Sequence, residues 1–204
     1  MREYSIDKFL DELSSGAPVP GGGGASALMG AVASSLCSMV ANLTTGKKKY
    51  AEYQGDIDRI LATTATLTGE IAGLIEKDAE VFEPLSKAYA IPKDTEGRDE
   101  ILENALRTAS DAPYEIVEMT NKVSLLIEEL SVKGSRLAIS DVGVAASACI
   151  AAAKGASMNV YINTKLMKDR EYADNMNKKT IALVNEVTER CDKAYELVLG
   201  GLIG

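Results

Sequence analysis

The sequence has no histidine, no tryptophan and only two phenylalanines among its 204 residues. The lack of histidine excludes Ser-His-Asp and Cys-His catalysis, and it excludes zinc or iron sites with histidine ligands. Because large aromatic side chains are scarce, the core has to be built from Ala, Leu, Ile, Val and Met. Any acid–base chemistry must rest on another kind of side chain, and a carboxylate in an apolar setting is the candidate.

The sequence also lacks closely spaced cysteines. Its three cysteines are far apart and form no CxxC pair, which disfavours a disulfide framework or a metal cluster. Each lies among small apolar residues, a setting typical of a buried thiol. They are Cys37, Cys149 and Cys191.

An excess of positive charge is missing too. The net charge is −8 at pH 7, whereas a nucleic-acid-binding protein is expected to have a basic face. The first twelve residues carry six charged side chains, so they are not a secretory signal and we expect a cytoplasmic protein. Residues 24–45 are long enough to span a membrane, but seven Ser, Thr and Asn residues make them too polar to face lipid. We therefore predict no nucleic-acid partner and no membrane partner.

The stretch from Pro18 to Lys49 combines four consecutive glycines, a long uncharged run of small residues and three lysines. The glycines precede a helical pattern, so free backbone N–H groups of a helix N-terminus are expected where the glycines allow close approach. One interpretation is a cradle for an anionic or polar ligand, and the other is an ordinary Pro-Gly loop. The spacing matches neither the P-loop nor the Rossmann fingerprint.

Apolar residues recur at helical spacing along most of the chain, and no run reads as a strand. We predict an all-α single domain over residues 1–204. It is expected to be a multihelical bundle around two central small-residue helices that are buried all round. Pro113 either ends one helix and begins another, or kinks a continuous helix. The expected helices are 5–13, 24–45, 50–90, 98–130, 137–166 and 169–199.

Asp78 is a carboxylate on an apolar stripe. Its helical neighbours one and two turns away are Ile71, Leu74, Ile75, Phe82 and Leu85. A carboxylate there has to be paired, hydrogen-bonded or shifted towards its protonated form, which suits general acid or base catalysis near neutral pH. The alternative is an edge position or a structural salt bridge. Pro84 is expected to kink the same helix and to open space near Asp78.

Polar residues mark both ends of the second small-residue helix. Asp141, next to Ser140, is expected to cap its start. Asn159 and Asn163 are four residues apart and share one face near its end. They can hold the amide edge of a heterocycle or form a hydrogen-bond pair between helices, and spacing alone favours the pair. Lys47–Lys49 form a basic patch that either attracts an anion or is a solvated helix end.

Together these segments resemble the cyclodeaminase/cyclohydrolase family, which includes the cyclodeaminase domain of formiminotransferase-cyclodeaminase and free-standing methenyltetrahydrofolate cyclohydrolases. The resemblance rests on the order and spacing of PVPGGGGASAL, MVANLTTGKKKY, KDAEVF, SDVGVAA and MNVYIN, and it covers essentially the whole chain. It implies a multihelical homodimer that acts on one-carbon units carried by tetrahydrofolate. It also implies that no metal and no further cofactor is needed.

The resemblance also implies roles for individual residues. Asp78, in KDAEVF, corresponds to the proposed catalytic residue of the family. The family usually has three glycines before a small residue, so the fourth glycine here is a departure from its pattern. The substrate-binding residues that it implies are Gly21, Gly22, Gly23, Gly24, Ser140, Asp141, Asn159 and Asn163. Lys47, in the basic patch, is a candidate contact for the glutamate tail of folate.

Three functions are compatible with these features. The first is hydrolysis of 5,10-methenyltetrahydrofolate to 10-formyltetrahydrofolate, in which one carboxylate serves as base and then as acid. It is favoured because no formiminotransferase domain is attached. The second is formiminotetrahydrofolate cyclodeaminase, which releases ammonia through the same type of tetrahedral carbon. The third is a non-catalytic folate-binding helical dimer.

Overall fold

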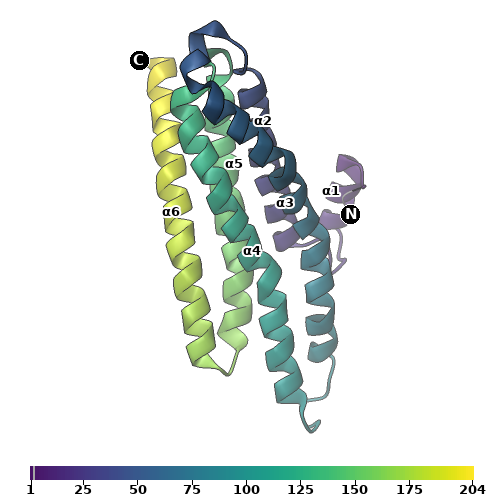
Figure 1. Ribbon diagram of the computed structural model, residues 1–204. Coiled ribbons are helices and arrows are strands. Elements are labelled where there is room, and N and C mark those ends of the chain that lie inside the picture. Colours follow the sequence, from purple (N-terminus) through teal and green to yellow (C-terminus); the bar gives the residue numbers. More distant parts are fainter. Residues whose placement is uncertain (2) are drawn as a thin grey trace.

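The computed structural model describes Met1 and residues 3–204, and this part of the chain is helical without any β-strand (Figure 1). The prediction of an all-α bundle is therefore confirmed. The α-helices are α1 (Ile6–Ser14), α2 (Gly22–Asn42), α3 (Gln54–Tyr89), α4 (Arg98–Lys133), α5 (Ile139–Leu166) and α6 (Arg170–Ile203). Two short 3-10 helices, η1 (Lys48–Tyr53) and η2 (Arg136–Ala138), precede α3 and α5.

The five long helices lie side by side, and α1 lies beside them near the N-terminus (Figure 1). Helix α5 packs against α2, α4 and α6, while α2 packs against α3, α4 and α5. The C-terminus and the α2–α3 connection lie at one end of the bundle, and the α3–α4 and α5–α6 connections lie at the other (Figure 1). This arrangement gives the bundle two ends whose residues are far apart in space.

The local signals in the sequence explain where several helices begin and continue. The hydroxyl of Ser5 accepts a hydrogen bond from the N–H of Lys8 at 3.1 Å, so Ser5 caps α1 as its residue type favours. Helix α4 runs without a break through Pro113, which decides between the two interpretations of that proline. Helix α3 likewise continues past Pro84 to Tyr89, so that proline does not end the helix.

Helices α2 and α5 approach each other closely because small residues line their contact. A Cβ atom on Gly155 of α5 would lie 2.5 Å from the hydroxyl oxygen of Ser26 in α2. That hydroxyl is held in place because it donates to the carbonyl oxygen of Gly22 at 2.7 Å. Gly30 similarly faces Ala152, with the methyl groups of Ile71 and Thr120 nearby. Small side chains therefore set the spacing of these two helices.

The three cysteines are buried in the core, as their surroundings in the sequence indicate. Burial raises the pKa of the Cys37 thiol to about 12, and a hydrogen bond with Cys191 together with burial raises the pKa of Cys149. The thiol of Cys149 donates to the carbonyl oxygen of Thr120 at 3.3 Å. Cys37 and Cys149 are therefore neutral packing residues at physiological pH.

The expectation that both small-residue helices are buried all round is wrong. By length and composition alone, helix α2 and the segment Arg136–Leu166 are long and apolar enough to cross a membrane. In the most apolar 18-residue stretch of each, however, only 56% and 50% is buried inside the chain. Each presents its other side to the outside of the chain, including Val32 of α2 and Val144 of α5. Apolar composition requires an apolar neighbour, but it does not require that neighbour to belong to the same chain.

The close contact between α2 and α5 predicts opposite effects for two Gly→Ala substitutions. Gly155→Ala should lower the free energy of unfolding by about 1–3 kcal/mol, because the new methyl group overlaps a fixed hydroxyl. Gly69→Ala in α3, where a Cβ atom meets nothing within 4 Å, should raise it by about 0.5–1 kcal/mol. Urea denaturation followed by circular dichroism measures both values. Equal effects of the two substitutions would contradict the proposed contact.

Candidate active site

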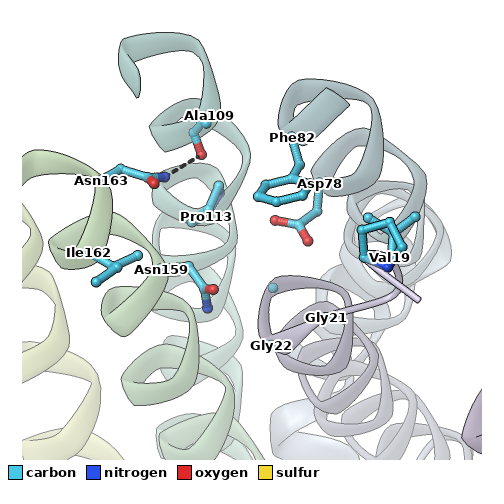
Figure 2. A pocket seen from close by; sticks show the side chains of 12 residues that line it. Val19, Gly21, Gly22, Asp78, Phe82, Ala109, Pro113, Asn159, Ile162 and Asn163 are labelled. Atoms are coloured by element: carbon cyan, nitrogen blue, oxygen red, sulfur yellow. Dashed lines mark hydrogen bonds between the residues drawn. The ribbon is translucent and has the colours of Figure 1, made fainter. Parts of the chain in front are cut away.

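A pocket of about 210 Å³ lies between the N-terminus of α2 and helices α3, α4 and α5. Figure 2 shows Asp78 and Phe82 on its α3 side and Asn159 and Asn163 on its α5 side. A neighbouring hollow of about 330 Å³ shares some of its wall. The pocket is lined by Pro18, Val19, Gly21, Gly22, Gly23, Asp78, Phe82, Ala109, Pro113, Asn159, Ile162 and Asn163.

The carboxylate of Asp78 lies directly against the first turn of α2. A Cβ atom on Gly23 would overlap this carboxylate, so any larger residue at that position would displace it. Gly21 and Gly22 also line the pocket, and the backbone N–H of Gly24 forms a hydrogen bond with Asp78. Three of the four glycines therefore form a wall of the pocket, and the fourth contributes a backbone N–H to the carboxylate. The first N–H groups of a helix have no partner within that helix, so this position suits an anionic side chain.

Burial raises the pKa of Asp78 above its ordinary value, because the charged form is poorly solvated there. The hydrogen bond from Gly24 acts in the opposite direction and offsets part of this effect. The sequence predicted that a carboxylate on this stripe has to be hydrogen-bonded or shifted towards its protonated form, and Asp78 shows both features. A half-buried carboxyl group with a raised pKa can exchange a proton near neutral pH.

Pro113 and Asn163 form a linked pair across α4 and α5. Proline has no N–H, so Pro113 leaves the carbonyl oxygen of Ala109, four residues earlier, without its helical partner. The side-chain nitrogen of Asn163 donates to that oxygen at 3.0 Å (Figure 2). This hydrogen bond fixes the orientation of the amide, because a carbonyl oxygen accepts only from the amide nitrogen. The missing N–H at Pro113 was the signal in the sequence that could have predicted this contact.

Asn159 is oriented in a similar way within its own helix. Its side-chain nitrogen donates to the carbonyl oxygen of Gly155 at 3.0 Å, and its amide lies against Gly22. Asn163 thus forms the buried hydrogen bond between helices that the spacing favoured, whereas Asn159 bonds to a backbone oxygen of its own helix. Within the described residues neither amide oxygen has a hydrogen-bond donor. The pocket therefore offers two oriented amide oxygens together with the Asp78 carboxylate.

Three of the residues that the sequence predicted for the site lie elsewhere in this chain. Lys47 follows α2, and its ammonium group donates to the hydroxyl of Ser135 at 3.2 Å. Ser140 and Asp141 lie within the first turn of α5, whereas Asn159 is near its end. The N-cap is Ala138 and no side chain caps the helix, so the expectation that Asp141 caps it is wrong. Helix α5 rises about 1.5 Å per residue, so Asp141 and Asn159 are separated by about 27 Å. One chain thus assembles the glycines, Asp78 and both asparagines, but it does not bring Lys47, Ser140 or Asp141 to them.

Several pocket residues escaped the sequence analysis because they have no polar chemistry of their own. Phe82 follows Asp78 by one turn and forms part of the wall that the pocket shares with the neighbouring hollow. Pro18 and Val19 complete that shared wall from the loop before α2. Ile162, between the two asparagines, lines the pocket while 56% of its surface remains exposed. Within the described part of the chain, no group of three or more Cys, Asp or Glu side chains is arranged to hold a metal ion.

Comparisons with known proteins agree on one family. The model of the family described as formiminotransferase-cyclodeaminase matches residues 5–182. The methenyltetrahydrofolate cyclohydrolase of Methylorubrum extorquens is 39% identical over 198 residues, which are 95% of this chain and 95% of that protein. The formimidoyltransferase-cyclodeaminase of Mus musculus is 29% identical over 98% of this chain, but the match spans 37% of that longer protein. The crystal structure of formiminotetrahydrofolate cyclodeaminase from Thermotoga maritima superposes with a TM-score of 0.84 at 30% identity, covering 97% of this chain and 98% of that one.

The raised pKa of Asp78 predicts how its substitution changes stability with pH. The folded state holds this proton more tightly than the unfolded state, so Asp78 disfavours folding once the pH exceeds its unfolded pKa of about 3.9. Asp78→Asn should therefore raise the free energy of unfolding at pH 7, and the gain should vanish as the pH falls below 4. Urea denaturation at pH 7 and at pH 3.5 measures the difference. A substitution that destabilises the protein equally at both pH values would contradict the burial of this charge.

Proposed function

The chain belongs to the formiminotransferase-cyclodeaminase family, and we propose that it hydrolyses 5,10-methenyltetrahydrofolate to 10-formyltetrahydrofolate. The family model and the Methylorubrum relative confirm the family resemblance that the sequence predicted. The observation that carries the proposal is the half-buried Asp78 carboxylate, held by the N-terminus of α2 at the wall of a pocket. The relative named methenyltetrahydrofolate cyclohydrolase matches this chain over 95% of both lengths, which favours hydrolysis as the reaction.

The reaction requires one group that accepts a proton and later returns it. The bridging carbon of the methenyl group is a cationic, amidinium-type centre that water can attack. Asp78 takes a proton from the attacking water, which leaves a neutral tetrahedral carbon bearing a hydroxyl group. Asp78 then returns this proton to the ring nitrogen N5 as the bond between that nitrogen and the carbon breaks. The hydroxyl loses its proton to solvent as the formyl group forms, so the net reaction releases one proton.

The amides of the pocket fit one edge of the substrate. Asn159 and Asn163 each present an oxygen whose orientation is fixed by a hydrogen bond from the same amide. Such acceptors match the N–H groups of a reduced pterin ring, and the negative Asp78 favours the cationic methenyl centre. The pocket of about 210 Å³ is small for a whole folate, but the adjoining hollow of about 330 Å³ offers room for the remainder.

Formiminotetrahydrofolate cyclodeaminase is the second candidate function. The structure of this enzyme from Thermotoga maritima superposes on nearly the whole chain, and the mouse relative is a formimidoyltransferase-cyclodeaminase. In that reaction N10 attacks the 5-formimino carbon, and Asp78 would protonate the nitrogen that leaves as ammonia. Both reactions use the same tetrahedral carbon and the same carboxylate, so a comparison of the two substrates is needed to distinguish them.

We also propose the setting in which the protein works. Three buried free thiols suit a reducing compartment, which supports a cytoplasmic location. Asp78 supplies the proton transfer, so we propose that no cofactor is needed beyond the tetrahydrofolate that carries the carbon unit. The exposed apolar sides of α2 and α5 support a homodimer, since such surfaces are usually covered.

Asp78→Asn should lower kcat for methenyltetrahydrofolate hydrolysis by about 10²–10⁴, because the amide cannot accept and return the proton. The loss of methenyltetrahydrofolate absorbance measures the rate above the spontaneous reaction. Asp58→Asn is the matched control, since Asp58 lies in the same helix and is exposed. Unchanged turnover by Asp78→Asn would remove Asp78 from the mechanism and favour a non-catalytic folate-binding protein.

A side-by-side assay distinguishes the two enzymatic functions. The purified protein receives methenyltetrahydrofolate in one series and 5-formiminotetrahydrofolate in the other, and ammonia release is recorded in the second. We expect a larger kcat/KM for methenyltetrahydrofolate. A larger kcat/KM for the formimino substrate would instead establish the cyclodeaminase, and no turnover of either would refute both.

A further inference from the structure

The hollow of about 330 Å³ beside the pocket differs from the pocket in its chemistry. The pocket contains the Asp78 carboxylate and two oriented amide oxygens, so it suits a ring that donates hydrogen bonds. The hollow has an apolar wall and an exposed polar rim formed by Glu80, Glu83 and Ser86. Its apolar residues are Pro18, Val19, Ala79 and Phe82. The hollow therefore suits a flat apolar group.

Phe82 stands where the two cavities meet, since it lines both of them. Figure 2 shows its ring extending from α3 close to the carboxylate of Asp78. Phe82 follows Asp78 by four residues on this helix, so its Cα atom lies about 6 Å further along the helix axis. A group that touches the Phe82 ring therefore lies about one helical turn from the proton-transfer group.

We propose that the hollow is a subsite for the p-aminobenzoyl ring of the folate, and that this ring stacks against Phe82 while the reduced pterin occupies the pocket. This inference rests on the proposed function and deepens it. In methenyltetrahydrofolate the reacting carbon joins N5 of the pterin to N10, and N10 is bonded directly to the benzoyl ring. When this carbon lies beside Asp78 and the pterin faces the asparagines of α5, the benzoyl ring falls on the α3 side, at Phe82 (Figure 2).

The charges of the rim favour the benzoyl ring over the glutamate tail as the occupant of the hollow. Glu83 pairs with Lys87 at 2.6 Å, whereas Glu80 has no ion-pair partner within the described residues. A tail carboxylate inside the hollow would face the uncompensated charge of Glu80, while the neutral benzoyl ring avoids this repulsion. The tail therefore extends past the hollow into solvent.

The substitution Phe82→Leu isolates the contribution of the aromatic ring. Phe82 packs against a core cluster that includes Leu85 and Leu106, and leucine keeps an apolar side chain in that contact. Leucine has no ring face, so it cannot form the offset-stacked or edge-to-face contacts that aromatic pairs prefer. Phe82→Tyr keeps the ring. Urea denaturation followed by circular dichroism verifies that both variants fold.

Two fragments of the substrate test the subsite without any turnover. The first, p-aminobenzoylglutamate, carries the benzoyl ring, and the second, 6,7-dimethyltetrahydropterin, carries the reduced pterin. Phe82→Leu should raise the dissociation constant of the first about three- to tenfold and change that of the second less than about twofold, because stacking is lost only for the first. Phe82→Tyr should restore binding of the first to about the wild-type value. Titrations followed by saturation-transfer NMR measure these constants.

Phe9→Leu is the matched control, because it makes the same substitution at the other phenylalanine of the chain. Phe9 is buried against Ala27 and Leu74, and it lines neither the pocket nor the hollow. It should leave both dissociation constants unchanged. Equal weakening of both fragments by Phe82→Leu, or weakening of the pterin alone, would refute the subsite. A wild type that does not bind p-aminobenzoylglutamate would refute it as well.

Steady-state kinetics test the same contact during turnover. For methenyltetrahydrofolate, Phe82→Leu should raise KM about three- to tenfold with a much smaller change in kcat, because the benzoyl ring meets Phe82 equally in the bound substrate and in the transition state. An unchanged KM in an active Phe82→Leu enzyme would overturn the subsite and leave the proposed function standing. A wild type that binds p-aminobenzoylglutamate through Phe82 but turns over no folate would instead refute the proposed function and support the subsite.

Discussion

The contact between the Asp78 carboxylate and the first turn of α2 is the constraint on which the site depends. This carboxylate occupies the space that any side chain at Gly23 would fill, and it is held by the N–H of Gly24. The glycines thus let a helix N-terminus approach a carboxylate from another helix, while burial keeps the pKa of that carboxylate raised. The contact is held in place because residues of both α2 and α3 belong to the hydrophobic core.

The other side of the pocket depends on a hydrogen-bond donor that is missing from the backbone of α4. Pro113 removes one N–H from α4, and Asn163 of α5 supplies the donor that the carbonyl oxygen of Ala109 would otherwise lack. The amide oxygen of Asn163 is then available to a ligand, and Asn159 is oriented by a backbone oxygen of its own helix. Pro113 therefore does not break α4. Through the carbonyl oxygen that it leaves unpaired, it orients the side chain of Asn163, fifty residues later in the sequence.

The same small residues that bring α2 and α5 together also create the apolar surface on their outer side. Ser26 and Gly155 allow the two helices to pack closely, while Val32, Val144 and Met158 point away from the chain. Ile162 lies on this surface and also lines the pocket, so the apolar surface extends to the edge of the pocket. The fold thus provides a half-open pocket at one end of the face and the basic segment Lys47–Lys49 at the other.

The sequence by itself determined the helices, the family and the identity of the proton-transfer candidate. Helical periodicity extends over many turns, and Asp78 stands out because its helical neighbours are apolar. Only the tertiary structure decided that Pro113 continues α4, that the asparagines bind backbone oxygens and that Lys47 and Asp141 lie far from Asp78. It also decided that α2 and α5 are half-exposed. The reason is physical: periodicity reports which residues share a face of one helix, whereas the partner of that face depends on how separate helices meet in space.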